Sequence, residues 1–208
     1  LVGSYRLLLT HPVLEREMPH VFLSTIYPDC LTKGLDFARG GARFNWSSFT
    51  ITGMANIIDS CYTVKKLVYE DRLLPLSELN EALNRNYAGH EDLLQKIRSL
   101  PKYGNDIDEV DALGTRIANL LYDAADTFHA HQDTRVTLGY VTVTKSVSLG
   151  KYTGATADGR LAFEAFADGI SPIHEYDVSG PTAVMNSSSK LNLARAGEGC
   201  ILNQKFVP

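Results

Sequence analysis

The sequence predicts an α/β chain, and two patterns along its 208 residues carry that prediction. Up to about residue 132, apolar residues recur at spacings of three and four, which is typical of amphipathic helices. From residue 135 onward, valines alternate with polar residues, which is typical of strands with one buried face. The composition is 44% apolar, enough to bury a core, and no linker-like stretch interrupts it. We therefore predict one unit over residues 1–208, mostly helical in 1–132 and strand-rich in 133–208.

Four segments of the first part have helical spacing. The first covers residues 53–71, and its apolar face comprises Met54, Ile57, Ile58, Cys61, Val64 and Val68. A second helix is predicted over residues 76–87, with Ser77 as N-cap because its hydroxyl can accept from the first free backbone amides. The spacing predicts two further helices, over residues 90–100 and from about residue 107 to residue 128.

The second part is predicted to hold strands joined by turns. The period of two over residues 135–147 indicates a strand whose valines Val141, Val143 and Val147 face one side. "GATADGR", residues 154–160, is typical of a turn, and "GPTAVMNSSSKL" and "GCILNQKF" are each predicted as a short strand. Gly180-Pro181 would form the turn into the first of these two strands.

Charge and hydropathy argue against several classes of partner. The net charge is -4 and the pI is about 5.9, and neither Lys nor Arg dominates any stretch. We therefore expect no binding to nucleic acid and none to an anionic membrane surface. No apolar run approaches the length that a bilayer span requires. The chain begins without Met and within an apolar run, which suggests a piece of a longer protein, and a reducing cytoplasm fits its unpaired thiols best.

Local motifs predict no metal or cofactor site. Cys30, Cys61 and Cys200 lack the paired spacing of a zinc site or a disulfide framework. The acidic run at residues 106–111 lacks the central Gly and the terminal Glu of a calcium loop, so helix capping explains it better. His129 and His131 lie two residues apart, which places them on different faces of a helix. Residues alone therefore name no catalytic group, no metal ligand and no bound cofactor.

Five segments in order carry a family resemblance. They are "RGGARFNW", "KKLVYED", "PKYGNDIDEVD", the long run "KYTGATADGRLAFEAFADGISPIHEYDVSGPTAVMNSSSKL", and "GCILNQKF". Together they resemble the glycyl radical enzymes, the pyruvate formate-lyase-like family. The resemblance implies part of a barrel of two half-sheets with flanking helices. It also implies a radical reaction in which a backbone glycyl radical oxidises a cysteine to a thiyl radical, which then abstracts hydrogen from a small substrate.

The resemblance also implies what this sequence lacks. The family's thiyl cysteine lies in a Gly-Cys-x-Glu motif upstream of "GGAR", and no such motif occurs here. Its radical loop reads Arg-Val-x-Gly-Tyr, whereas "RVTLGY" has one extra residue and lies before "NQKF" rather than after it. Gly139 is therefore predicted to be a bend or bulge at the entry of a strand. The chain alone should not catalyse the family reaction and has no catalytic residue of its own.

The same resemblance suggests which residues face the substrate of the full-length enzyme. "GPTAVMNS" and "NQKF" point to the dehydratase and lyase branch rather than the acyl-transferring branch. By strand alternation, Thr182, Val184 and Asn186 would lie on one side and line the substrate pocket, the alternative being a core strand end. Asp158, Arg160 and Asp168 are predicted to be structural, with Arg160 pairing with the Asp168 carboxylate.

The family resemblance also implies partners. The full-length enzyme would be a homodimer that receives its glycyl radical from a separate radical S-adenosylmethionine activating enzyme, in an anaerobic cytoplasm. Two alternatives stay open: a formate acetyltransferase-type acyl transfer, and a non-catalytic piece that binds or complements a partner. As a separate piece, the chain is expected to expose apolar surface from Val184, Ile201 and Leu202 and to associate.

Overall fold

The computed structural model describes residues 2–128, 134–204 and 206, so the predicted positions of His129 and His131 lie outside the described residues. The chain forms two compact units rather than the single unit predicted. The smaller unit contains residues 1–49 and 122–137, and the larger contains residues 50–121 and 138–208. The boundaries between the two units fall inside two strands and a helix rather than inside loops. The sequence at these boundaries therefore does not have the composition of a linker.

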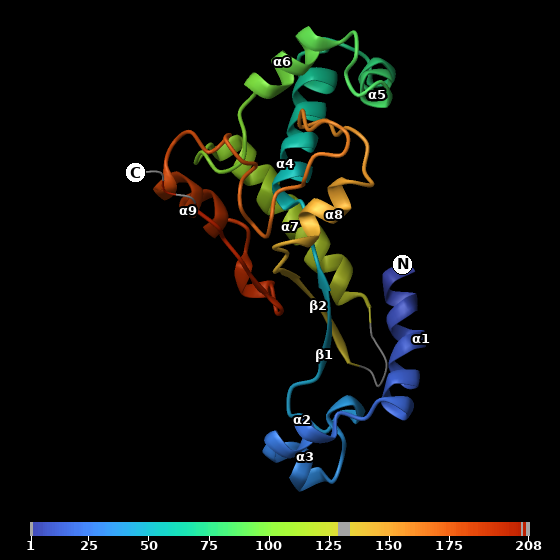
Figure 1. Cartoon of the computed structure of the whole chain (residues 1–208). Helices are drawn as coiled ribbons and strands as arrows, with labels where there is room; N and C mark the ends of the chain where they lie inside the picture. The colour runs from blue at the N-terminus through green and yellow to red at the C-terminus, as the bar shows by residue number, and fades with distance from the viewer. Residues whose placement is uncertain (1, 129–133, 205, 207–208) are drawn as a thin grey trace. The chain divides into compact units, whose positions relative to one another are not determined.

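The smaller unit is mainly helical (Figure 1). Its elements are α1 (Val2–Glu17), α2 (Val21–Ile26), α3 (Pro28–Lys33) and a 3-10 turn (Phe37–Arg39). The Asp36 carboxylate holds this unit's first turns together, because it accepts hydrogen bonds from the backbone N–H of His20, the hydroxyl of Ser24 and the N–H of Ala38. These bonds satisfy amides that would otherwise be unpaired at helix starts.

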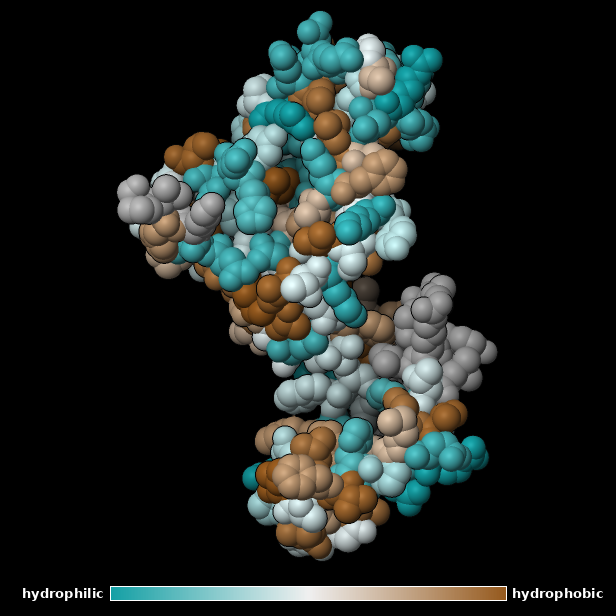
Figure 2. All heavy atoms as spheres, in the orientation of Figure 1, coloured by the Kyte–Doolittle hydropathy of each residue, from teal (hydrophilic) through white to brown (hydrophobic). Residues whose placement is uncertain are grey.

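Apolar side chains are strongly exposed in the smaller unit. Figure 2 shows hydrophobic residues gathered over the α2 and α3 segments. The large ones that are more than a third exposed are Val13, Leu14, Met18, Val21, Phe22, Leu23, Ile26, Tyr27, Leu31, Leu35, Phe44 and Trp46. An isolated exposed apolar residue is ordinary, but a contiguous group of this kind is typical of an interaction surface.

Helices dominate the larger unit, and the four predicted helices are confirmed. They are α4 (Met54–Thr63), which continues into a π-helix (Val64–Glu70), then α5 (Leu76–Asn84), α6 (Glu91–Ser99) and α7 (Asp108–Asp126), which begins in this unit. Two details were wrong: Pro75 rather than Ser77 is the N-cap of α5, and Ile57 is 43% exposed. The side chain of Ile58 packs closely on Gly114 of α7, where a Cβ would lie 3.0 Å from the Ile58 Cδ1 atom.

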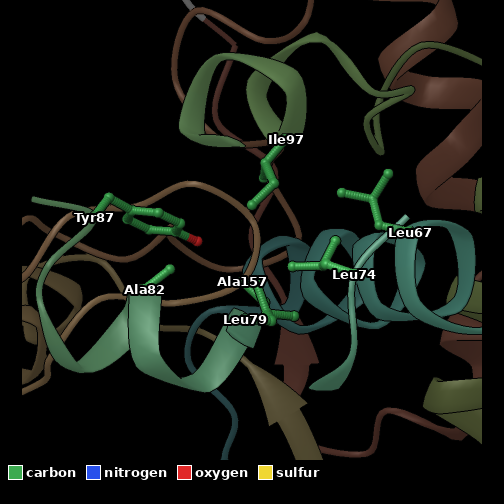
Figure 3. Packing of buried hydrophobic residues seen from close by; sticks show 7 residues of the cluster. All are labelled: Leu67, Leu74, Leu79, Ala82, Tyr87, Ile97 and Ala157. Carbon is green, nitrogen blue, oxygen red and sulfur yellow. The ribbon is translucent and has the colours of Figure 1, made fainter. Parts of the chain in front are cut away.

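The apolar core of the larger unit joins helices to a loop (Figure 3). Its buried members are Leu67, Leu74, Leu79, Ala82, Tyr87, Ile97 and Ala157. Ala157 belongs to the "GATADGR" segment, which lies some 60 residues beyond α6 in sequence. The Tyr87 hydroxyl donates to the Thr156 carbonyl at 2.8 Å. The ring of this tyrosine thus packs in the apolar core while its hydroxyl binds the loop backbone.

Three strands form one sheet in the order β1-β2-β3, with β1 at Trp46–Thr50, β2 at Arg135–Tyr140 and β3 at Gly199–Cys200. Strands β2 and β3 are parallel, and Gly139 pairs with Gly199. The backbone N–H of Ile51 donates to the carbonyl of Gly139 at 2.8 Å. Gly139 therefore lies within regular strand pairing, and the prediction of a bend or bulge at strand entry was wrong.

The prediction that residues 133–208 are strand-rich was also wrong. Residues 145–150 form helix α8 (Lys145–Gly150), and "GPTAVMNSSS" forms helix α9 (Pro181–Ser189) rather than a strand. Pro181 occupies the first turn of α9, where its missing N–H costs nothing and its fixed φ suits a helix. Two of the α9 serines donate within the helix, since the Ser188 hydroxyl donates to the Val184 carbonyl and the Ser189 hydroxyl to the Asn186 carbonyl, both at 2.8 Å.

The close approach of two backbones explains Gly139. A Cβ at this position would lie 2.4 Å from the Glu198 Cβ and 2.9 Å from the Gly199 carbonyl oxygen. We expect Gly139→Ala to destabilise the chain by about 1 to 3 kcal/mol, because backbone must shift to accommodate the methyl group. Chemical denaturation measures this, with Gly154→Ala as the matched control, since nothing lies within 4 Å of a Cβ there. Equal stability of the two variants would contradict the explanation.

Candidate functional site

The three predicted pocket residues do not share a face. All lie on α9, where Thr182 and Asn186, four residues apart, share an exposed face, while Val184 points to the buried side and is 1% exposed. The Asn186 side-chain amide donates to the Asp106 carboxylate at 2.8 Å, so it has a partner within the chain. Ile201 and Leu202 are only half-buried, whereas Val184 belongs to the core, which corrects the predicted apolar surface. A substrate contact for Thr182, Val184 and Asn186 stays a prediction.

Asp158 lies at the centre of a buried polar network. It is 1% exposed, and its carboxylate accepts from the Asn56 amide at 2.6 Å, from the Thr156 hydroxyl and from the Arg160 N–H. The Lys102 ammonium donates to the Asp158 carbonyl at 2.9 Å. Asn56 belongs to α4 and Lys102 to the "PKYGNDIDEVD" segment, so one aspartate joins two of the sequence segments that carry the family resemblance to each other and to α4.

Arg160 is almost fully enclosed, at 5% exposed. Its guanidinium donates to the carbonyl oxygens of Gly154, Leu161 and Glu164, and its Cζ atom lies 4.3 Å from the ring centroid of Phe166. Five donors in a rigid fork suit this set of carbonyls, which lysine could not satisfy together. Arg160 therefore holds together the two sides of the loop that begins at "GATADGR", because its guanidinium binds carbonyls before and after it in the chain.

The predicted pairing of Arg160 with Asp168 was wrong. The Asp168 carboxylate instead accepts a hydrogen bond from the Asn203 side-chain amide. The Asp168 carbonyl accepts from the N–H of Ser171, and the Ser171 hydroxyl accepts from the N–H of Asn203. The reason is local: the guanidinium is saturated by backbone carbonyls, while Asp168 lies where the chain passes the carboxyl end of β3.

Two adjoining clefts open beside these segments. A cleft of ≈ 590 Å³ has the side chains of Arg98, Glu164 and Tyr176 among its walls, together with Asp158 and Arg160. A second cleft, of ≈ 500 Å³, is lined by Ser171, Pro172, His174, Glu175, Asp177, Asn203 and Gln204. His174 and Glu175 line both clefts. These volumes are in the range that small organic ligands occupy.

The second cleft lies where the chain leaves the parallel pair β2 and β3, which is where α/β sheets commonly bind ligands. Asn203 and Gln204 follow β3 directly, and the Gln204 amide donates to the Pro181 carbonyl at 3.0 Å, next to the start of α9. Sequence reasoning missed His174, Glu175 and the "NQ" pair as lining residues. One signal was available: polar residues directly after a predicted strand.

Glu175 has an unusual backbone. Its φ is 71°, in the left-handed region that favours glycine, and its side chain is exposed. A non-glycine residue held in this conformation stores about 1 to 3 kcal/mol of strain. Six other described non-glycine residues also have a positive φ, but Glu175 is the one among them that lines both clefts, so the meeting point of the clefts is the candidate ligand-binding region.

Thiols and carboxylates in the described part of the chain form no metal site. Cys30 is buried, Cys200 is exposed, and burial raises the pKa of the Cys61 thiol, which keeps it in its unreactive form. Nor does any helix among the described residues have the length and apolar character to cross a membrane. The side chains that line the two clefts supply amide, carboxylate, imidazole and guanidinium groups, which can bind and orient a ligand.

Comparison with known proteins agrees with the motifs. Residues 7–150 match the family described as pyruvate formate lyase-like, and residues 166–208 match the family described as glycine radical. Gly139 lies in the first match and outside the second, which agrees with its place in β2 rather than in a radical loop.

Individual relatives cover nearly all of this chain. Trans-4-hydroxy-L-proline dehydratase of Clostridioides difficile is 34% identical over 94% of the chain and 25% of that enzyme. A crystal structure titled hydroxyproline dehydratase from this organism, with its substrate bound, has a TM-score of 0.91 at 32% identity, covering 96% of this chain and 25% of that one. Glycerol-bound glycerol dehydratase from Clostridium butyricum has a TM-score of 0.89 at 36% identity, covering 93% and 25%.

The chain therefore spans about a quarter of the length of the relatives it matches. Its fold is a part of theirs, with helices beside a short parallel sheet. The match to the pyruvate formate lyase-like family covers more than half of the residues, and a glycine radical match follows it along the chain. The chain belongs to the pyruvate formate-lyase-like family of glycyl radical enzymes.

Proposed function

We propose that this chain is a portion of a glycyl radical enzyme of the dehydratase or C–X lyase branch, which acts on a small polar organic substrate by radical elimination or bond cleavage. One observation carries the proposal: relatives that match over more than nine-tenths of the chain are named as dehydratases, of trans-4-hydroxy-L-proline and of glycerol. Both named substrates are small and carry hydroxyl groups, which suits clefts lined by amides and carboxylates.

The chain's own part in this function is to hold and shape one wall of the enzyme. The network around Asp158 and Arg160 fixes the segment that runs beside both clefts. Preorganised polar groups of this kind orient a substrate without further loss of entropy when it binds. His174, Glu175 and Asn203 are the residues we propose to face that space, besides the predicted contacts of Thr182, Val184 and Asn186.

Further elements belong to the whole protein in this proposal. The glycyl radical acts as the cofactor-like element, and the glycine radical match over residues 166–208 supports its presence in the full-length enzyme. A separate radical S-adenosylmethionine activating enzyme installs the radical. We also propose a homodimeric full-length enzyme that works in an anaerobic cytoplasm.

The first test is the intact mass of the protein in its native source, with sequencing of both ends. We expect a species much heavier than 22.9 kDa, with a Gly-Cys-x-Glu motif upstream and an Arg-Val-x-Gly-Tyr loop downstream. After anaerobic activation, that species should show the doublet of a glycyl radical by electron paramagnetic resonance and should dehydrate or cleave a small hydroxylated substrate. A native species of 22.9 kDa would leave only the alternative of a binding or complementing piece.

The 208-residue chain by itself supplies the matching control. Because its sequence contains neither of the two motifs, we expect no radical signal and no turnover from it under the same activation. A radical signal from this chain alone would overturn the assignment of the radical glycine to a loop beyond "NQKF". Formate acetyltransferase activity of the activated full-length species, with no dehydratase activity, would instead favour the acyl-transferring branch.

A further inference from the structure

Asp59 is a buried carboxyl whose hydrogen bonding is half complete. It lies on α4 and is 1% exposed. One of its oxygens accepts from the backbone N–H of Tyr103 at 2.8 Å, while among the described residues the other oxygen, Oδ2, has no hydrogen-bond partner. A buried carboxylate needs several donors or a close cation to remain ionised, whereas a neutral carboxyl does not. Its surroundings therefore favour the protonated group.

The charged and titratable groups around Asp59 come from two segments packed on α4. From residues 101–106 come Lys102 and Tyr103, and from the "GATADGR" loop comes Asp158. Burial raises the pKa of Asp59 to about 7, Lys102 partly opposes this shift, and the negative charge of Asp158 adds to it. Lys102 is itself 4% exposed, and burial lowers the pKa of its ammonium group.

The Lys102 ammonium contacts the wall of the larger cleft, and its charge also acts on Asp59. In the present arrangement its ammonium donates to the Asp158 carbonyl at 2.9 Å and lies 5.5 Å from the centroid of the Tyr176 ring. Tyr176 and Asp158 are walls of the larger cleft. If Asp59 loses its proton, the new buried anion attracts the Lys102 ammonium, and this attraction competes with the contacts that Lys102 makes to the cleft wall.

We propose that Asp59 and Lys102 form a proton-controlled switch: with Asp59 neutral, Lys102 fastens the cleft wall at Asp158 and Tyr176, and with Asp59 ionised, Lys102 turns toward it and releases that wall. The proton goes to solvent and no bond other than O–H is broken. The switch concerns the fold of the larger unit and does not depend on the function proposed above. It is a two-state element biased by one proton, as pH-sensing proteins use.

Linkage sets the sign of the pH dependence. The unfolded chain has the ordinary carboxyl pKa of 3.8, while the folded one holds its proton up to about pH 7. Between these values the folded state binds one more proton, so the unfolding equilibrium constant rises up to tenfold per pH unit. The stabilisation of the folded state by protonated Asp59 is complete below about pH 4. It falls as the pH rises and levels off above about pH 7.

Carbon-detected NMR of the aspartate carboxyl groups in the 208-residue chain tests the switch, with Asp59→Asn identifying the resonance. We expect a midpoint near pH 7 and a change in the Lys102 ammonium resonance at the same midpoint. A midpoint below pH 5, or a Lys102 resonance that does not follow it, would overturn the proposal.

Denaturant unfolding between pH 5 and pH 7 gives an independent readout. Asp59→Asn keeps the acceptor for the Tyr103 amide and cannot ionise. The unfolding equilibrium constant of this variant should therefore not show the rise with pH that Asp59 causes in the unaltered chain. Asp92→Asn, which changes an exposed carboxyl on α6, should keep it. Lys102→Met should raise the midpoint of Asp59 above that of the unaltered chain, because the opposing cation is gone. Identical slopes for Asp59→Asn and the unaltered chain would also refute the switch.

Discussion

Arg160→Met is expected to destabilise the larger unit by about 3 to 5 kcal/mol, because several enclosed acceptors lose their donor and each costs about 1 to 3 kcal/mol. The guanidinium supplies the carbonyls of Gly154, Leu161 and Glu164 and stacks on Phe166. Methionine preserves much of the side-chain volume but provides no N–H group. Urea denaturation followed by circular dichroism measures the loss.

Two further variants show whether the loss comes from the donors. Arg160→Lys keeps a positive charge but lacks the planar fork, so its stability should lie between those of the unaltered chain and Arg160→Met. Arg85→Met removes an exposed arginine whose ion pair with Glu81 is 3.5 Å long, and it should change stability by at most about 0.5 kcal/mol. If Arg160→Met were as mild as Arg85→Met, the loop would not depend on this arginine.

Lys190→Met should have the second large effect. The Lys190 ammonium lies 2.8 Å from the carboxylates of Asp106 and of Asp111, and 3.3 Å from that of Asp108. Asp111 is 1% exposed, so the substitution leaves a buried negative charge without its cation. We expect a loss of about 2 to 4 kcal/mol, less than for a fully buried pair, because the Lys190 side chain is 35% exposed.

A double variant and a surface control sharpen this result. Lys190→Met combined with Asp111→Asn removes both charges and should recover part of the stability lost in the single variant. Lys66→Met disrupts pairs with Glu70 and Asp71 on the surface, and should cost at most about 1 kcal/mol. Equal losses in Lys66→Met and Lys190→Met would show that burial of Asp111 does not set the energy.

The helices were predictable because their signals are local. Apolar residues at spacings of three and four indicate the buried face of α4, and Met54 and Ile58 are indeed fully buried. Ile57, at the edge of the same apolar face, is 43% exposed, because the width of the buried stripe depends on which neighbour packs on it. Apolar periodicity therefore predicts which side of a helix is buried, whereas the packing of neighbouring elements decides how wide that buried face is.

Helix α9 was predicted as a strand because its composition is ambiguous. Thr182, Val184 and the serines that follow are acceptable in strands, and Gly180-Pro181 is as suitable for a turn as for a helix start. What decides the outcome is burial: Val184, Ser187 and Ser188 are covered, and the Ser187 and Ser188 hydroxyls bond with Asp106 and Tyr103 of a distant segment. The candidate pocket residues were assigned to one face on the strand period, so that error changed the site as well.

Sequence by itself determined the family, the helical segments and the absence of both radical motifs from these 208 residues, because motifs, periods and composition are written in neighbouring residues. Tertiary structure alone decided the partners of Asp158, Asp168 and Asp59. Their side-chain hydrogen bonds reach residues far away in sequence, Asn56 for Asp158, Asn203 for Asp168 and Tyr103 for Asp59, and no local pattern encodes them. Burial then sets how strongly each charge must be compensated, and burial exists only once the chain has folded.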